Sequence, residues 1–408
     1  MSTWAAKVKT LLFTSSALTI ASSLMFFPKA TKEAAVLGLE MWWNVVFPSL
    51  LPFFIVSELL IGFGFVNLIG ALFEPLMRPL FRVPGTGGFV WALGLASGYP
   101  AGAKLTARLR QENQLSKIEA ERLVSFTNFS NPLFIFAAVA VGFFKNEELG
   151  ILLAACHYLG NFCVGLVMRF YGRDEHRGAG KEKKPALTVR KAFQILHRKR
   201  MEDNRPLGQL LGDAVHSSVS TLLLIGGFII LFSVVSKVFS ILHVTHALSG
   251  VLAFFFSLLH IPPEMSQAVV AGFFEITLGS RIASEIDVSL LFQVVAASFV
   301  LAFSGFSVQA QVASILADTD IRFKPFFLAR CMHGVFASCF TLLLWKPLYV
   351  NRTSGSSAVE VFNPDIAHSW VTEAWRLLLH YGSFVTLAAL LAYIAVTMKL
   401  MKNKSPVN

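Results

Sequence analysis

The sequence predicts an all-α polytopic membrane protein made of two inverted-topology repeats, each with a re-entrant helical hairpin and a broken transmembrane helix. The chain of 408 residues is 55% hydrophobic, only 14% charged and contains 39 phenylalanines. This apolar content exceeds what the core of a soluble protein requires. Several segments are long and apolar enough to cross a bilayer, and short motifs recur in the two halves.

A helix needs roughly 20 mostly apolar residues to cross about 30 Å of hydrocarbon. The segments of this kind are 11–27, 35–64, 149–171, 217–243, 325–349 and 376–398. Together with the two broken helices, they predict about eight spans, with both termini on the inner side of the membrane. The first segment resembles a signal peptide, but no small-residue cleavage site follows it. We interpret it as a retained helix.

The order of these segments predicts the following parts. An N-terminal transmembrane helix (1–34) precedes a first repeat (35–171), which contains a re-entrant hairpin (85–103) and a broken helix (118–143). A basic linker (172–206) leads to a second repeat (207–349) with a hairpin (264–282) and a broken helix (288–317). An outer loop (350–375) and a C-terminal transmembrane helix with its tail (376–408) complete the chain.

Motifs repeated at a constant spacing indicate the duplication. "GAKLTARL" at 102–109 matches "GSRIASEI" at 279–286, and "FTNFSNP" at 126–132 matches "FSGFSVQ" at 303–309, both 177 residues apart. A third match, one residue out of this register, superposes His157 on His333. A packing role for these two histidines is favoured over a proton relay.

The charges indicate that the two repeats are oppositely oriented. Basic residues follow the first hairpin motif, whereas Glu285 and Asp287 follow the second. The linker between Arg169 and Arg205 carries twelve Lys and Arg. Basic loops beside membrane helices stay on the cytoplasmic side, where anionic lipid headgroups are the expected partner. Because the +11 net charge gathers in such loops, nucleic-acid binding is not expected.

The stretch "SGYPAG" at 97–102 cannot continue a helix. Gly98 and Gly102 allow backbone angles closed to other residues, and Pro100 has no amide donor. Irregular backbone at membrane depth is tolerated only against protein or a water-filled cavity. We therefore expect this stretch to be a hairpin tip that lines a cavity; an ordinary turn after a span is the alternative.

Polar side chains gather in the second element of each repeat. The first cluster contains Thr127, Asn128, Ser130 and Asn131, and its counterpart contains Ser304, Ser307 and Gln309. Unpaired amides and hydroxyls are costly in hydrocarbon, so we expect both clusters on a substrate path. Hydrogen bonding between helices is the alternative for any single residue.

One cation stands at the end of each hairpin: Lys104 and, in the repeat register, Arg281. Two cations beside amide-rich broken helices suit a small anion with two carboxylates. Each cation could instead reach a lipid headgroup. Glu275 could pair with Arg281 or carry a coupling proton. The sequence shows no nucleophile with its base, phosphate loop or metal-ligand cluster, so we expect neither an enzyme nor a cofactor.

"SGYPAGAKLTARL" followed by "EAERLVSFTNFSNPLFI" resembles the nucleoside-recognition Gate group, and within it the sporulation integral membrane proteins. The likeness covers about residues 40–350. It implies a transporter fold with two re-entrant hairpins and two unwound helices. It further implies a role in endospore formation, moving dipicolinic acid from the mother cell across the outer forespore membrane.

By the resemblance, the residues that match the motif are expected to bind substrate. They are Gly98, Pro100, Gly102, Lys104, Asn128, Ser130 and Asn131. The second repeat lacks the proline and the asparagines, so its residues rest on the internal alignment alone. A dipicolinate carrier working by alternating access is the leading hypothesis. A nucleoside or nucleobase permease and a non-transporting scaffold in spore assembly are the alternatives. The sequence leaves the oligomeric state and the energy source open.

Overall fold

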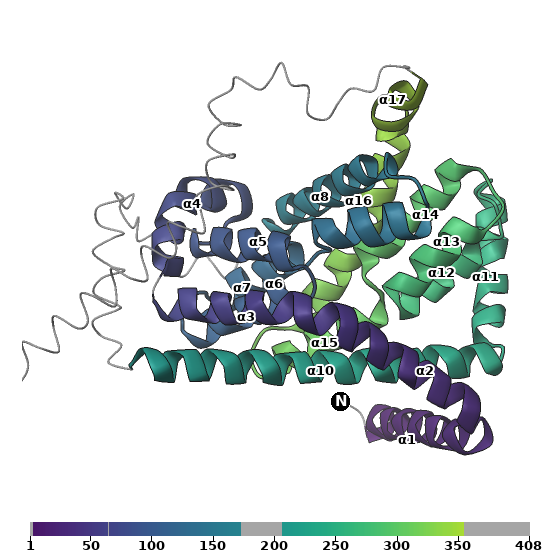
Figure 1. Cartoon of the computed structure of the whole chain (residues 1–408), viewed down its shortest axis with the longest axis horizontal. Helices are drawn as coiled ribbons and strands as arrows, with labels where there is room; N and C mark the ends of the chain where they lie inside the picture. The colour runs from purple at the N-terminus through teal and green to yellow at the C-terminus, as the bar shows by residue number, and fades with distance from the viewer. Residues whose placement is uncertain (1–2, 64, 173–205, 355–408) are drawn as a thin grey trace, which may run out of the picture. The chain divides into compact units, whose positions relative to one another are not determined.

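The computed structural model describes residues 3–63, 65–172 and 206–354, and every element in these ranges is helical (Figure 1). The first part of the chain forms α1 (Thr3–Phe26), α2 (Pro28–Met41), the π-helix η1 (Trp42–Val46), α3 (Phe47–Gly62), α4 (Phe65–Phe81), α5 (Thr86–Ser97), α6 (Ala101–Gln111), α7 (Lys117–Thr127), the π-helix η2 (Phe134–Phe143) and α8 (Leu149–Met168).

After the basic linker, which lies almost entirely outside the described residues, the second part begins with a long helix. Its elements are α10 (Leu207–Ile241), α11 (Val244–Leu258), α12 (Met265–Phe274), α13 (Ile276–Glu285), α14 (Leu290–Phe303), α15 (Gly305–Ala317), α16 (Phe323–Trp345), the π-helix η4 (Lys346–Val350) and α17 (Asn351–Ser354). The chain divides into two compact units, Met1–Val350 and Asn351–Asn408. The predicted outer loop and the predicted helix 376–398 lie outside the described residues.

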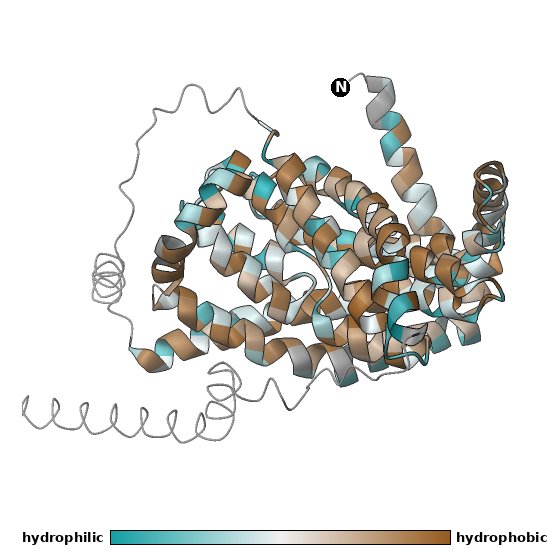
Figure 2. Ribbon diagram, turned by 90° about the horizontal axis from the view of Figure 1, so that it is seen from above, coloured by the Kyte–Doolittle hydropathy of each residue, from teal (hydrophilic) through white to brown (hydrophobic). Residues whose placement is uncertain are grey.

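Five helical segments in the described ranges are long and apolar enough to cross a membrane: Lys7–Phe26, Leu149–Met168, Leu207–Ile241, Leu290–Ala317 and Phe323–Val350. Figure 2 shows apolar residues along most of the helices. Many large apolar side chains are exposed on them, such as Leu343 at 70% and Phe254 at 63%. An apolar surface of this extent suits a lipid environment, as a polytopic membrane protein requires.

In the first half, the helices break where the sequence places its glycine, proline and amide residues. Segment 85–103 contains α5 and the first residues of α6, separated at Gly98, whose φ is +80°, and at the cis Tyr99–Pro100 peptide. Segment 118–143 contains most of α7 and all of η2. Between these two helices Asn131 Oδ1 accepts a hydrogen bond from Phe134 N at 2.8 Å, which satisfies an amide at the start of the following helical stretch.

In the second half, the breaks are shorter. Segment 264–282 forms α12 and most of α13 with Glu275 alone between them, and the Glu275 carboxylate accepts a hydrogen bond from Leu278 N at 2.7 Å as the cap of α13. Segment 288–317 forms α14 and α15 with Ser304 between them. Ser304 has φ +71°, a left-handed conformation that ends a helix.

Helices from the two halves pack together. α16 lies against α8 and also contacts α14 and α7. The long helix α10 runs beside α2 and α3 (Figure 1), and there Trp42 Nε1 donates to the Leu222 carbonyl at 2.9 Å. The first half and the second half therefore share one bundle, in which α8 and α16 bring their polar residues side by side.

Two helices were not predicted. The apolar run of α4 is interrupted by Glu74, Pro75, Arg78 and Pro79, so it does not read as a span. α11 has 15 residues, fewer than a spanning helix needs. In addition, α10 begins at Leu207 rather than at the predicted residue 217.

Candidate functional site

In the first half, the break between α5 and α6 packs directly against the end of α7. A Cβ on Gly102 would lie 2.1 Å from the Thr127 carbonyl oxygen, and one on Gly94 would lie 2.5 Å from the same atom. Asn131 Nδ2 donates to the Ser97 carbonyl at 3.0 Å across the same contact. Glycine is required because any side chain would push the two broken segments apart.

The second half has a corresponding contact. A Cβ on Gly305, whose φ is +67°, would lie 3.0 Å from the Gly272 carbonyl oxygen and 3.4 Å from Glu275 Cα. The first residue of α15 therefore touches the break between α12 and α13. In each half, an interrupted helix meets the interruption that follows it in the chain.

The guanidinium of Arg330, on α16, lies at the end of α7. Nη1 donates to the Asn128 carbonyl at 2.7 Å, and Nη2 donates to the Ser125 carbonyl and to Asn161 Oδ1, the latter at 3.3 Å. The side chain is fully buried. Because α7 stops at Thr127, these carbonyls lack partners within the helix, and Arg330 supplies them.

Two histidines continue this network between α8 and α16. Arg330 Nη1 lies 3.1 Å from His333 Nδ1, and His333 Nε2 lies 2.8 Å from the His157 carbonyl oxygen. Ser130 N donates to His157 Nε2 at 3.1 Å. A guanidinium and a backbone amide can only donate, so His333 carries its proton on Nε2 and His157 carries its proton on Nδ1. Both imidazoles are neutral in this arrangement.

Tyr99, in the α5–α6 break, connects the two halves. Its hydroxyl donates to the Leu301 carbonyl on α14 at 3.1 Å. The side chains of Arg330, Ser130 and Ser304 lie near the same hydroxyl. Three of the four helix breaks, those at 98–100, 128–133 and 304, therefore contribute groups to one buried polar centre around Arg330.

This centre contains buried polar atoms without a hydrogen-bond partner in the part of the chain that is described. Buried polar groups are almost always satisfied, so each one marks a place for water or a ligand. Those at the breaks or beside them are Ser97 Oγ, Asn128 Nδ2 and Oδ1, Ser130 Oγ, His157 Nδ1, Ser304 Oγ, Gln309 Oε1 and Arg330 Nε. Most of these groups can donate a hydrogen bond, which suits an anionic ligand better than a cation.

Lys104 is buried, but it is paired. Its Nζ lies 3.5 Å from Glu58 Oε1 on α3 and 4.6 Å from the centre of the Phe54 ring. Glu58 also accepts a hydrogen bond from Ser217 Oγ at 2.9 Å. The positive charge of Lys104 is therefore balanced by a carboxylate that the motif did not reveal.

The second predicted cation lies in a different environment. The Arg281 side chain is 56% exposed and lies 3.7 Å from Glu285, one turn further along α13. Glu275 caps α13, and none of the described contacts joins it, or Lys104, to Arg281. The structure thus brings Asn128, Ser130 and Ser304 together around Arg330, while Lys104 and Arg281 each pair with a local carboxylate.

The remaining predicted residues have varied surroundings. Thr127 is buried and donates to the Leu123 carbonyl of its own helix at 2.8 Å. Ser307 is buried in α15. Gln309, on the same helix, donates to the Phe303 carbonyl at 3.0 Å, which leaves its Oε1 unpartnered. Gly98 and Pro100 form the α5–α6 break itself.

Sequence reasoning missed Arg330 and Tyr99 as site residues. A signal for Arg330 was available, because an arginine within a 23-residue apolar helix is a candidate functional residue by default. Tyr99 stands within the predicted hairpin tip, yet only the fold shows which groups its hydroxyl faces. Within the described ranges, no three His, Cys, Asp or Glu side chains are grouped so as to hold a metal ion.

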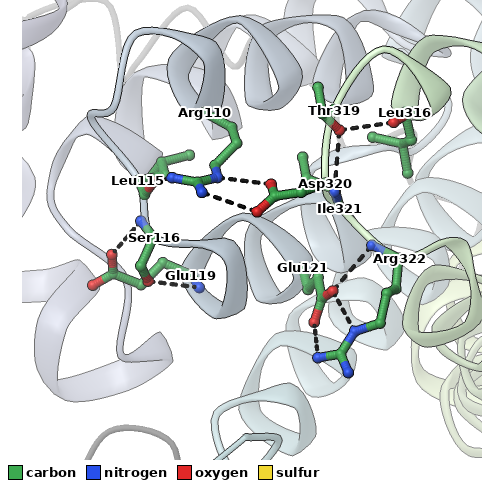
Figure 3. Close-up of polar contacts among 10 residues, drawn as sticks. All are labelled: Arg110, Leu115, Ser116, Glu119, Glu121, Leu316, Thr319, Asp320, Ile321 and Arg322. Carbon is green, nitrogen blue, oxygen red and sulfur yellow. Dashed lines mark hydrogen bonds and ion pairs between the residues drawn. The ribbon is translucent and has the colours of Figure 1, made fainter. Parts of the chain in front are cut away.

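A second polar cluster joins the two halves at the α15–α16 loop (Figure 3). Arg110 donates from Nε and Nη2 to the two carboxylate oxygens of Asp320, at 2.9 and 3.0 Å. Arg322 donates in the same forked way to Glu121, at 2.7 and 3.0 Å. The hydrogen bonds from Arg110 hold the pKa of Asp320 below its usual range. We call these two ion pairs the loop latch.

The sequence is similar to a known family and to a known protein. Residues 43–147, which include the breaks at 98–100 and 128–133, match the Gate family, described as nucleoside recognition. The chain is 56% identical over 393 residues to the sporulation integral membrane protein YlbJ of Bacillus subtilis (strain 168), and the match covers 96% of both chains. No solved structure matches the chain. Together with the apolar helices, this identity confirms an integral, multi-pass membrane protein, and the chain belongs to the YlbJ family of sporulation integral membrane proteins.

Proposed function

We propose that this protein is a transporter that carries dipicolinic acid, a small aromatic dicarboxylate, from the mother cell across the outer forespore membrane. One observation carries the proposal: broken helices from both halves meet at a buried centre that is rich in unpartnered donors and contains Arg330. Discontinuous helices that meet near the midplane are typical of substrate sites in secondary transporters. A role in sporulation follows from the name of the relative.

The order of elements supports an inverted duplication. Each half contains a helix pair broken at the predicted hairpin, then a second broken pair, then a long helix that carries the matched histidine. His157 and His333 are separated by 176 residues in sequence, yet their ring centres lie 4.6 Å apart. Equivalent residues meet in this way near a two-fold axis. We propose that the two repeats are oppositely oriented and rock about this axis to give alternating access.

On this proposal, the pairs α5–α6 and α12–α13 are the re-entrant hairpins of the two repeats. Their close glycine contacts with the neighbouring broken helices would transmit movement of one repeat to the site. The loop latch joins α6 and α7 to the α15–α16 loop, and we propose that it closes the inner side in the present conformation.

A nucleoside or nucleobase permease is the second candidate, because the matching family is described as nucleoside recognition. A neutral nucleoside could use the Asn, Ser and Gln side chains of the centre. It would not need a buried cation without a carboxylate partner, and Arg330 therefore favours an anionic substrate.

Uptake by the purified protein in lipid vesicles tests the two candidates. We expect labelled dipicolinate to accumulate above the level in protein-free vesicles, and labelled uridine not to do so. Uridine uptake without dipicolinate uptake would favour the permease. Uptake of neither compound, by protein that is shown to be folded and inserted, would contradict both.

A further inference from the structure

Arg330 differs from the other deeply buried cations of the described residues. Three such side chains are at most 9% exposed: Lys104, Arg122 and Arg330. Lys104 pairs with Glu58. Arg122 donates to the carbonyls of Arg82 and Tyr171, and the carboxylate of Glu119 attracts it from nearby. No described carboxylate pairs with Arg330, whose contacts are carbonyls, an amide oxygen, His333, Tyr99 and the ring of Phe326, 5.4 Å from Cζ to the ring centre. A buried charge of this kind is costly unless a partner compensates it.

Part of the charge stabilises the end of α7. The carbonyl groups at a helix C-terminus carry a partial negative charge, which a nearby cation complements. The bonds to Ser125 and Asn128 therefore explain the two terminal guanidinium nitrogens of Arg330. They do not explain Nε, which has no partner among the described residues, or the hydroxyls of Ser130 and Ser304 nearby, which also lack one there. A purely structural cap would not need these additional donors.

We infer that Arg330 binds one carboxylate group of the transported anion, with the hydroxyls of Ser130 and Ser304, which have no partner among the described residues, around the same group. The inference rests on the proposed function and names the residue that recognises the charge. A guanidinium with neighbouring neutral donors is the arrangement that proteins use for carboxylates. The hydroxyls come from both halves, so the anion would bridge the two repeats.

The charge of the centre indicates how many carboxylates of the ligand are recognised by a cation. Within the described ranges the centre offers one cation without a carboxylate partner, Arg330, while Lys104 pairs with Glu58 of α3 and Arg281 pairs with Glu285. One carboxylate of the ligand is therefore recognised by charge. The rest of the ligand contacts neutral groups such as Asn128 and His157, which have unpartnered polar atoms. Because Arg330 is fully buried, the ligand reaches it only when the broken helices separate.

A series of ligands tests the inference on the unaltered protein. Binding to the purified full chain in detergent is measured by calorimetry for dipicolinate, for picolinate, which has one carboxylate, and for the neutral pyridine-2,6-dicarboxamide. We expect picolinate to bind within about tenfold of dipicolinate and the diamide to bind at least about a hundredfold more weakly. A diamide that binds as tightly as dipicolinate would overturn the inference, although dipicolinate binding itself would still support the proposed function.

Substitutions provide the second test. R330Q removes the charge, R330K keeps it without the planar fork, and K324Q removes an exposed charge from the same helix as a matched control. We expect R330Q to weaken dipicolinate binding at least about tenfold, R330K to weaken it less, and K324Q to leave it unchanged. Wild-type affinity in a folded R330Q protein would contradict the role of Arg330. No dipicolinate binding to wild type would instead contradict the proposed function.

If R330Q does not fold, S130A and S304A give the same test without disturbing the α7 cap. Their hydroxyls have no partner in the described structure, so their removal should leave thermal stability nearly unchanged. We expect each substitution to weaken dipicolinate binding severalfold and to leave binding of the diamide unaltered. Equal loss for both ligands, or no loss for either, would contradict a carboxylate site at this position.

Discussion

The imidazole rings of His157 and His333 lie 4.6 Å apart, although the residues are separated by 176 positions in the sequence. His333 connects Arg330 on one side to the His157 carbonyl on the other. His157 in turn accepts the amide of Ser130 at the α7–η2 break. The two histidines therefore hold Arg330 in a fixed position relative to the α7–η2 break.

Substitutions at His333 separate its two hydrogen bonds. The Oδ1 atom of H333N lies near the position of Nδ1 and can still accept from Arg330, whereas H333A cannot. We expect H333A to lower the free energy of unfolding by about 1–3 kcal/mol, since it leaves a buried donor without its partner, and H333N to lower it less. Thermal unfolding in detergent measures both. Equal stability of the two variants would show that the bond to Arg330 contributes nothing.

The glycine contact at the first break gives a steric prediction. G102A would place a Cβ 2.1 Å from the Thr127 carbonyl oxygen, and a backbone atom cannot move aside as a flexible side chain can. We expect a loss of about 1–3 kcal/mol or more in stability, together with loss of dipicolinate uptake. G227A is the control, because no atom of the described residues lies within 4 Å of a Cβ there. Similar melting temperatures for G102A and G227A would contradict the close packing of the breaks.

The helix interruptions have local causes, which a sequence can carry. Gly98 with Pro100 and Asn128 with Pro132 cannot continue a regular helix, and the structure breaks its helices at both places. The second-half interruptions carry weaker signals, yet the internal alignment led to Glu275 and Ser304, where α12 and α14 end. The unpredicted helices α4 and α11 were missed because short or proline-interrupted runs resemble loops.

The contents of the site could be predicted only in part. Polar residues in an apolar segment are visible in the sequence as candidate site residues. Asn128, Ser130 and Ser304 lie at the polar centre around Arg330. Lys104 pairs with Glu58, which stands 46 positions earlier in the sequence (104 − 58). This pairing depends on how α3 packs against other helices. The contact of Arg330 with the α7 carbonyls has the same origin. Charge partners between helices are a property of the tertiary fold, which no motif contains.

The Lys104–Glu58 pair is predicted to be structural rather than substrate-binding. Both side chains are nearly buried, at 10% and 11% exposure, and removing Lys104 leaves the Glu58 carboxylate with Arg108 Nε, at 3.9 Å, as its remaining counter-charge. We expect K104M alone to destabilise the protein by about 1–3 kcal/mol, and the double variant K104M/E58Q to recover much of that loss. A double-mutant cycle of melting temperatures measures the coupling. Purely additive losses would show that the two groups do not interact.

Uptake measurements on variants of the two predicted cations distinguish two models of the anion site. If Lys104 and Arg281 form the predicted two-cation clamp, K104A and R281A should each strongly reduce dipicolinate uptake. If Arg330 is the centre, R281A should retain most of the uptake, because Arg281 is exposed and beside Glu285. Uptake by folded R281A in vesicles therefore decides between them.

The loop latch gives a dependence on pH. The pKa of Asp320 is lowered by the hydrogen bonds from Arg110. Its stabilisation is therefore complete above the unfolded pKa of about 3.9 and is lost as the pH falls through the lower folded value. Asp320 is 46% exposed, so the contribution is less than about 1 kcal/mol. D320N should lower the melting temperature at neutral pH and match wild type at the acid end of the range.

The control for this prediction is D318N, in the same loop. No ion pair joins Asp318 to a described cation, so D318N should leave the melting temperature at neutral pH close to that of wild type. High salt should reduce the effect of D320N, since exposed ion pairs are screened. A D320N protein that is destabilised equally at every pH would show that the Arg110 contact acts through packing rather than charge.

The opposite orientation of the two repeats predicts which loops share a membrane face. The α6–α7 turn at Asn113 and the α13–α14 loop at Asp287 follow the corresponding hairpins of the two halves. In an inverted pair they lie on opposite sides, with the more basic side inside. Positions 190 and 355, outside the described residues, should likewise differ, with 190 inside.

Single cysteines at these four positions are introduced after the native cysteines are replaced by alanine; the native cysteines are Cys156, Cys163, Cys331 and Cys339. The variants are expressed in vegetative cells, where the protein inserts into the plasma membrane. A membrane-impermeant maleimide added to these intact cells should label 287 and 355, and should label 113 and 190 only after the cells are opened. Labelling of 113 and 287 from the same side would mean that the repeats are parallel, and alternating access by inverted halves would then be wrong.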